Sequence, residues 1–434
     1  MAYETGRNET VPAVELTPYQ KIFYYEWLLD PKRYDYNVLD EKVIEGDLSV
    51  DRLNSVFVRF SNDYLLWRST VAEDGDKLYW KERDPLPDNA QAMRYFDKPI
   101  DDAEIFSILS QPFDLKNDLL FRAFLVKLSD RQYRFFHCYH HTVMDGAKVK
   151  PLYSEISNYY NDPDYTCAID LNKQKSLVGG LASSMQTFIN ENRNGMESFW
   201  REYSRESEPV DLAFLKGSMN NQADIDPLSP VSLCHFSFGR NNLDNARLLS
   251  RKYRATLYIY AQVILAMLFH LMTGQRRVSF SYPVTIPEGD ALIYGSQVNT
   301  LFINFSFDEG TTVAGLIEQA KGHFHDLKSF KAKYMPISDI HRFLDGKNVL
   351  QVAFANTSRE LYFNLNGTTK EINNERFYFD MSSMLLILME EKKDALHFWF
   401  KYKNRILDGK LVDNLAVRYQ RLFCDVTNSL IKEM

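Results

Sequence analysis

The sequence predicts a mixed α/β protein built from two domains. Helix-like stretches, in which apolar residues recur every three to four positions, alternate along the chain with strand-like stretches, in which apolar residues recur every second position. Both halves of the chain carry both patterns in similar proportion. The length of 434 residues also exceeds the roughly 250–300 residues at which a single hydrophobic core stops growing. We therefore expect two domains, each with a core of its own.

Elements of the first half follow from capping residues and periodicity. Thr17-Pro18 is typical of a helix start, because threonine caps the first turn and proline suits the first helical position, and Asp30-Pro31 ends the predicted helix 19–29. Two adjacent strands are predicted at 121–127 and 132–141, joined by a polar turn. The same reasoning predicts strands over 37–44, 67–71 and 77–80 and helices over 50–62 and 148–161.

The pattern loosens between residues 162 and 184, where Gly179-Gly180 occurs. We place a domain boundary there, near residue 175, which gives domains 1–175 and 176–434. Beyond the boundary, periodicity predicts helices over 185–203, 243–252, 256–272, 313–330 and 408–431, and strands over 231–238, 277–284, 299–307, 350–355 and 395–402.

Composition excludes several classes of protein. With 45% hydrophobic and 25% charged residues the chain is neither disordered nor fibrous, and a net charge of −7 without a basic tail argues against nucleic acid or an anionic membrane as partner. Four widely spaced cysteines predict free thiols in a reducing compartment, with no metal site. The polar residues 1–15 are no signal peptide, and the longest apolar run, 258–272, is shorter than the roughly 20 residues of a membrane span. We expect a cytoplasmic protein.

Three of the nine histidines cluster at the end of the predicted strand 132–141, in a segment that ends with His140, His141, Asp145 and Gly146. Successive strand side chains point to opposite faces, so only one of the two adjacent histidines looks into a cavity. His141, the last residue of the strand, reaches substrate, and His140 is structural. Imidazole titrates near pH 6.5, which suits it to accept a proton from an attacking amine or hydroxyl. Asp145 either orients the imidazole or pairs with an arginine, and Gly146 permits a tight turn whose N–H faces a developing oxyanion. This is the pattern of an acyl-transfer site.

The segment resembles the His-His-x-x-x-Asp-Gly signature of condensation domains of nonribosomal peptide synthetases, which are relatives of chloramphenicol-acetyltransferase-type acyltransferases. Other stretches match this family in the family's order and cover nearly the whole chain. They are Leu16-Thr17-Pro18-Tyr19-Gln20, Trp67-Arg68-Ser69, Pro112-Phe113-Asp114-Leu115, Thr273-Gly274-Gln275 and Gly295-Ser296-Gln297-Val298-Asn299.

The resemblance implies a V-shaped pseudo-dimer of two acetyltransferase-like subdomains with a tunnel between them. His141 is then the active-site residue, Gly146 keeps the backbone open for substrate, and Asp145 turns away to pair with Arg68. Asn299 is expected either to line the tunnel floor or to make a plain hydrogen bond at a strand end. Lys148 stands where the family has serine and is either a substrate contact in the tunnel or a surface residue of the following helix.

The resemblance also implies the reaction and the partners. A carrier protein presents an acyl or aminoacyl thioester on phosphopantetheine, an acceptor amine attacks it, and an amide forms, with no cofactor bound by the chain itself. We expect a monomer, free-standing because the chain starts at Met1 and shows no adenylation or carrier segment. Two alternatives stay open: an ester-forming or free-amine acyltransferase of the same fold, and a non-catalytic domain that only docks carrier proteins.

Overall fold

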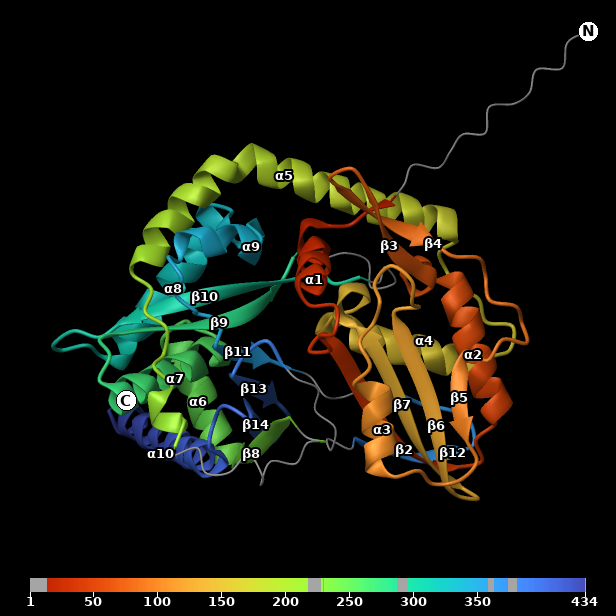
Figure 1. Cartoon of the computed structure of the whole chain (residues 1–434). Helices are drawn as coiled ribbons and strands as arrows, with labels where there is room; N and C mark the ends of the chain where they lie inside the picture. Colours follow the sequence, from red (N-terminus) through yellow and green to blue (C-terminus); the bar gives the residue numbers. More distant parts are fainter. Residues whose placement is uncertain are drawn as a thin grey trace, which may run out of the picture.

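Two β-sheets of five and six strands, each covered by helices, form the two halves of the molecule (Figure 1). The computed structural model describes residues 14–217, 228, 230–286, 295–357, 363–373 and 381–433. Helices and strands mix in both halves, which confirms the predicted α/β class. Each sheet has its own hydrophobic core, as the length of the chain predicts.

The N-terminal half is built on the five-stranded sheet β12-β2-β7-β6-β5. Its strands are β2 (Asn37–Gly46), β5 (Met93–Phe96), β6 (Phe121–Ser129) and β7 (Gln132–His140), with β12 (Thr368–Asn373) from the far end of the chain. Side chains at 135 and 137 on β7 face α2 (Val50–Asp63) and α4 (Val149–Asn161), where Phe135 packs on Phe57. The alternate side chains face α3 (Asp102–Leu109), because Arg134 pairs with Asp102 there. The histidine strand β7 is therefore central and covered on both faces.

A small sheet of β1 (Val14–Glu15), β4 (Lys77–Glu82) and β3 (Ser69–Asp74) stands beside this half. The helix α1 (Pro18–Leu29) starts as predicted, with Thr17 and Gln20 forming a capping box in which each side chain bonds to the other's backbone N–H. The predicted strand 67–71 is partly wrong, because residues 65–68 form the short 3₁₀ helix η1 (Leu65–Arg68) before β3 begins.

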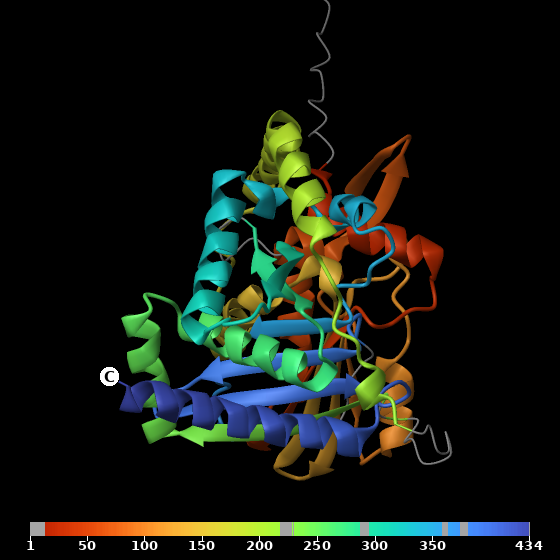
Figure 2. The same cartoon turned by 90° about the vertical axis from the view of Figure 1, so that its left-hand side faces the viewer.

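The C-terminal half is built on the six-stranded sheet β10-β9-β11-β13-β14-β8. Helices pack against this sheet (Figures 1 and 2). The strands are β8 (Val231–Gly239), β9 (Arg277–Thr285), β10 (Val298–Ser306), β11 (Val352–Asn356), β13 (Leu385–Glu391) and β14 (Ala395–Lys403), and the helices are α6 (Arg240–Lys252), α7 (Leu257–Thr273), α8 (Val313–Ser329), α9 (Ile337–Ile340) and α10 (Gly409–Lys432).

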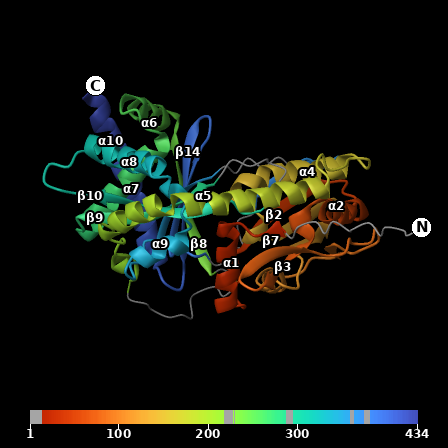
Figure 3. The ribbon, with the colours of Figure 1, turned by 90° about the horizontal axis from the view of Figure 1, so that it is seen from above.

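The predicted boundary near residue 175 lies inside one continuous helix, α5 (Leu171–Arg205). Figures 1 and 3 show α5 crossing over both halves, and it contacts β1 and η1 of the first half and the short helices η6 (Ala332–Tyr334) and η7 (His341–Phe343) of the second. Its buried residues recur every three or four positions, as in Val178, Ala182, Met185 and Ile189, so one apolar stripe holds both halves. The loosened sequence pattern, where we placed the domain boundary, therefore marks a helix that bridges the two halves.

The apolar run 258–272 belongs to α7, whose residues are mostly buried in the larger core. Among the residues that the structure describes, no single helix is long and apolar enough to cross a membrane, although α6 and α7 together, bent by 99° where they meet, pass that test by length and composition. The four cysteines are free thiols, as their spacing predicts.

Candidate active site

The two adjacent histidines lie where β7 ends and the short 3₁₀ helix η2 (His141–Val143) begins. His140 is the last strand residue and pairs with Asn37 of β2, and the backbone N–H of His141 donates to the Tyr36 carbonyl at 2.8 Å. The chain turns directly after this bond, so the two side chains take different directions. The structure thus separates an inner from an outer imidazole, as strand alternation predicts.

His140 is the inner imidazole and is 5% exposed. Its Nδ1 accepts the Thr142 backbone N–H at 3.2 Å, which leaves the ring proton on Nε2. The rings of Phe23, Tyr36 and Phe113 surround it edge-on, and burial lowers its pKa to about 3. His140 therefore stays neutral and fixes the backbone from which His141 projects.

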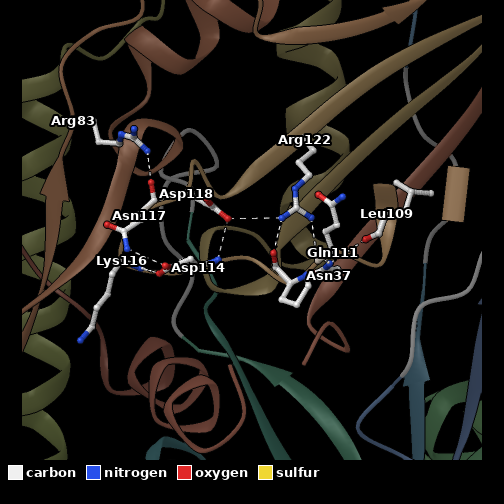
Figure 4. A network of polar contacts seen from close by, with 10 residues as sticks. Asn37, Arg83, Leu109, Gln111, Asp114, Lys116, Asn117, Asp118 and Arg122 are labelled. Atoms are coloured by element: carbon white, nitrogen blue, oxygen red, sulfur yellow. Dashed lines mark hydrogen bonds and ion pairs between the residues drawn. The ribbon is translucent and has the colours of Figure 1, made fainter. Parts of the chain in front are cut away.

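A polar network holds the loop that packs against His140 (Figure 4). Asn37 donates its side-chain amide to the carbonyls of Leu109 and Gln111, at 3.2 and 2.9 Å, and Arg122 donates to the carbonyls of Gln111 and Pro112, at 2.6 and 2.7 Å. The Arg122 guanidinium also lies 3.8 Å above the Phe113 ring, which touches His140. Residues 112–122 therefore support the inner imidazole, which gives a physical reason for the family-like stretch that begins at Pro112.

His141 is the outer imidazole and is partly exposed. Its ring stacks on Phe23 of α1, with centroids 5.3 Å apart and planes inclined by 20°, and its Nδ1 lies 3.5 Å from the Ser296 hydroxyl oxygen. Burial lowers the pKa of His141 from its ordinary value, although the nearby Asp145 carboxylate opposes that shift. The imidazole is therefore neutral at pH 7 and able to accept a proton.

Asp145 joins the histidine loop to the other half of the molecule. Its carboxylate is 2% exposed and accepts the backbone N–H of Gln297 at 2.8 Å and of Ala147 at 3.0 Å. The predicted ion pair between Asp145 and Arg68 is wrong, because the Arg68 guanidinium at the end of η1 points to Glu82 on β4 and bonds with that carboxylate. Two backbone amides satisfy the buried carboxylate in place of a cation.

Two further bonds reach the same loop, one from Ser296 and one from Gln20 of α1. The Ser296 N–H donates to the Thr142 carbonyl at 3.0 Å, and the Gln20 side chain donates to the same carbonyl at 3.4 Å. Gly295 has a positive φ of 124°, and a side chain there would meet Gln20 at 2.6 Å and Leu66 at 2.9 Å. Glycine is therefore needed for the second half to approach His141 this closely.

Gly146 and Lys148 belong to the short 3₁₀ helix η3 (Gly146–Lys148), which Asp145 caps. Gly146 has no positive φ, and a side chain at this exposed position would meet nothing within 4 Å, so the turn itself does not require glycine. That Gly146 leaves room for substrate stays a prediction. Lys148 is 5% exposed, so the expectation of a surface lysine is wrong.

Asn299 is 1% exposed, and its side chain forms hydrogen bonds only within the protein. Its Nδ2 donates to the carbonyls of Lys333 and Met335, at 3.1 and 2.7 Å, and its Oδ1 accepts the N–H groups of Thr300 and Ile337. The placement of Asn299 on a tunnel floor is therefore wrong, because none of its hydrogen-bonding positions is left for a substrate. The residue fixes the segment 333–337 against β10.

Sequence reasoning assigned no role to Phe23, Ser296 or Gln297, although all three touch the histidine loop. Ser296 and Gln297 lie in a stretch that resembles a family motif, and this resemblance was the one sign in the sequence that they belong to the site. Their contacts join residues more than 140 positions apart in the sequence, so the roles emerge only in the folded chain.

The structure has the fold class of the chloramphenicol-acetyltransferase-like proteins, with a histidine loop where two α/β halves meet. Within this class, residues 12–430 match the family called Condensation domain, and the chain belongs to that family. Two curated relatives are tyrocidine synthase 3 of Brevibacillus parabrevis, 23% identical over 96% of this chain, and phosphinothricin tripeptide synthetase PhsC of Streptomyces viridochromogenes, 22% identical over 90%. The chain spans 6% and 37% of the length of these relatives.

Solved structures share the fold at low sequence identity. The first condensation domain of the calcium-dependent antibiotic synthetase, with a substrate analogue, matches with a TM-score of 0.75 and 16% identity, covering 96% of both chains. The X-domain from teicoplanin biosynthesis matches with a TM-score of 0.75 and 16% identity over 98% of this chain and 96% of its own. A starter condensation domain of rhizomide synthetase, in complex with C8-CoA and Leu-SNAC, matches with a TM-score of 0.75 and 18% identity over 96% and 94%.

Proposed function

We propose that this protein is a condensation enzyme that joins a carrier-bound acyl or aminoacyl thioester to an acceptor amine. Condensation domains of nonribosomal peptide synthetases form amide bonds in general, and the chain belongs to their family. The observation that carries the proposal is the neutral imidazole of His141, held between Phe23 and Ser296 where the two halves meet. A basic group at such an interface suits a reaction in which two substrates approach from different sides.

The reaction requires one proton acceptor and precise placement of the amine against the thioester. The amine nitrogen attacks the thioester carbonyl, a C–N bond forms, the C–S bond breaks, and the proton lost by the amine passes to the leaving thiolate. An α-ammonium group has a pKa near 8, so its deprotonation before attack is not difficult. His141 serves as the general base or as the group that positions the amine, and both roles use a neutral ring of fixed orientation.

The proposal extends to partners and surroundings. Donor and acceptor carrier proteins present their substrates on phosphopantetheine, so the chain itself needs no bound cofactor, and it acts as a monomer in the cytoplasm. The two halves already complete one site, because Asp145 and Gln297 lie in the same chain. A second copy is not required for that contact.

Exchange of His141 for alanine tests the catalytic assignment. In a reconstitution with loaded carrier proteins we expect the His141→Ala variant to lose about 100-fold or more of the condensation rate, the usual contribution of a positioned acid–base group. His325→Ala, which removes an exposed histidine of α8, is the matched control and keeps the wild-type rate. Wild-type turnover by the His141 variant would refute the assignment.

The identity of the bond is tested in the same reaction. Intact-protein mass spectrometry of the acceptor carrier shows the joined product only if the acceptor is carrier-bound. Mild alkaline treatment cleaves the carrier thioester in either case, but it also hydrolyses an ester within the joined product and leaves an amide there intact, so the mass of the released product identifies the bond. A product found only on free amines, or one that base splits into its two parts, would replace amide condensation between carriers with one of the two alternative acyl transfers. Carrier binding without turnover would indicate a docking domain.

A further inference from the structure

The imidazole ring of His141 lies with its face against Phe23, a residue of α1. The two ring centroids are 5.3 Å apart and the ring planes are inclined by 20°, which is the geometry of an offset stack. Phe23 is 8% exposed, and its own ring is packed edge to face by Tyr36 at 4.8 Å and by His140 at 6.1 Å. Because Phe23 is itself held in place, the stack fixes the plane of the His141 ring.

The helix that supplies Phe23 is tied to the backbone that carries His141. The Tyr36 carbonyl accepts the His141 N–H at 2.8 Å, and the Tyr36 hydroxyl donates to the Glu26 carboxylate of α1 at 2.7 Å. Arg33 forms an ion pair with Glu26 at 2.7 Å and lies 4.7 Å from the centroid of the Tyr36 ring. Phe23 and His141 are therefore joined through Tyr36 as well as by their own contact.

A fixed plane still leaves two orientations of the imidazole, because a half-turn about the bond between the ring and Cβ exchanges Nδ1 with Cδ2. The Ser296 hydroxyl distinguishes between them. Ser296 is 0% exposed, and in the part of the chain that the structure describes its hydroxyl has one hydrogen-bond partner, His141 Nδ1 at 3.5 Å. In the turned ring a C–H group would face this hydroxyl and leave a buried polar group unsatisfied, which is unfavourable. Ser296 therefore selects the orientation with Nδ1 towards the second half.

The two contacts on the ring come from different halves of the molecule. Phe23 belongs to the first half, whereas Ser296 belongs to the second and is fixed to the histidine loop on both sides. The Ser296 N–H donates to the Thr142 carbonyl at 3.0 Å, and the N–H of the next residue, Gln297, donates to the Asp145 carboxylate at 2.8 Å. The orientation of the imidazole is therefore fully determined only where the halves meet.

We propose that Phe23 and Ser296 are positioning residues for the acyl transfer: Phe23 fixes the plane of the His141 ring, and Ser296 selects one of its two orientations. A group that accepts a proton or places an amine acts through the direction of one ring nitrogen, and a misplacement of about 1 Å costs on the order of 100-fold in rate. The effect on the rate rests on the proposed function, whereas the orientation of the ring does not. Neither residue belongs to the histidine motif, so the motif by itself does not orient its own imidazole.

Kinetics of the reconstituted reaction test the two residues separately. We expect Phe23→Leu, which removes the aromatic face, to lower kcat about 10-fold with KM unchanged, and Phe23→Tyr, which keeps the face, to restore most of the rate. Ser296→Ala is expected to lower kcat about 2-fold, because two ring orientations become equally populated and one is productive. Phe124→Leu is the matched control and keeps the wild-type kcat, since Phe124 on β6 stacks on Phe136, with centroids 4.4 Å apart, outside the site.

Nuclear magnetic resonance of the imidazole C–H groups reports the orientation of the ring without turnover, and the His141→Ala variant identifies the resonances of this ring. We expect one set of His141 resonances in the wild type, displaced by the ring current of Phe23. Ser296→Ala should show a second set or exchange broadening, and Phe23→Leu should lose the displacement. Ser281→Ala is the control and keeps one set, because the buried Ser281 hydroxyl donates to the Val352 carbonyl at 2.9 Å, away from the histidine loop.

The two measurements separate this inference from the proposed function. Unchanged His141 resonances or a wild-type kcat in the variant of either residue overturns the role of that residue. Changed resonances in both variants, together with a wild type that forms no amide, would refute the proposed function alone. Amide formation by the wild type, together with unchanged resonances in both variants, would refute this inference alone.

Discussion

Asp145 gives the most direct test of how the site is held together, because its carboxylate contacts both halves of the molecule. The bond to the Gln297 N–H, 2.8 Å long and buried, is charge-assisted and contributes about 1.5–3 kcal/mol. The bond to the Ala147 N–H caps η3 and contributes about 1 kcal/mol. We expect Asp145→Ala to lower the free energy of unfolding by about 3 kcal/mol and to separate residues 295–297 from the histidine loop.

The control removes a cap without an inter-half contact. Asp101 caps α3 and accepts the Glu104 N–H at 2.8 Å in an exposed position, so Asp101→Ala is expected to lose only about 1 kcal/mol. The difference between the two variants isolates the contribution of the Gln297 bond.

Two measurements determine the difference between Asp145→Ala and Asp101→Ala. The denaturant midpoint gives the stability of each variant, and hydrogen exchange of a peptide containing Gln297 gives local protection. Asp145→Ala should expose the Gln297 amide to exchange faster than the wild type by about 10-fold or more, while Asp101→Ala leaves it unchanged. If Asp145→Ala costs no more than Asp101→Ala and the Gln297 amide exchanges at the wild-type rate, the carboxylate does not join the halves and the reasoning fails.

Three further predictions follow from single contacts. Gly295→Ala is expected to lower the free energy of unfolding by about 2–4 kcal/mol, because a φ of 124° is strained for alanine and the added Cβ would displace the ends of the buried Gln20 and Leu66 side chains; an unchanged melting temperature would contradict this. His137 is fully buried, with neither ring nitrogen hydrogen-bonded within the described chain and a pKa lowered by burial to about 3. In the unfolded chain this imidazole takes up a proton below pH 6.5, so the stability of the wild type falls with acidification. Between pH 7 and pH 5, the free energy of unfolding of His137→Leu should therefore fall by about 2 kcal/mol less than that of the wild type in parallel denaturant titrations. Arg68 shares no partner with Asp145, so a double-mutant cycle of Arg68→Ala and Asp145→Ala should show a coupling energy below about 0.5 kcal/mol. A larger coupling energy would support the ion pair that the sequence predicted.

The sequence was a good guide wherever a signal is local. Capping residues and periodicity predicted α1, β7, α7 and α10 nearly to their ends, and strand alternation separated His140 from His141. Elements without a strong period, such as α3, β5 and β13, were missed. Their positions depend on neighbours in the sheet or on packing that short-range patterns do not contain.

Partners of polar side chains were predicted poorly, for a physical reason. A buried carboxylate needs hydrogen-bond donors, and backbone N–H groups serve as well as an arginine. Which donor is present depends on the path of the chain: Gln297 arrives at Asp145, whereas Arg68 lies beside Glu82. Asn299 likewise completes its bonds with a loop more than 30 residues away, which a strand-end asparagine does not reveal by itself.

The two halves exchange elements for the same reason, and this exchange bears on function. The strand β12, from the second half by sequence, pairs with β2 and completes the sheet that carries the histidines, while α5 spans both halves. Residues 295–297 then close on the histidine loop from the other side. The site therefore depends on three independent connections between the halves, so a shift of one half against the other changes the surroundings of His141 directly. The stability of those contacts and the geometry of the site are therefore expected to vary together.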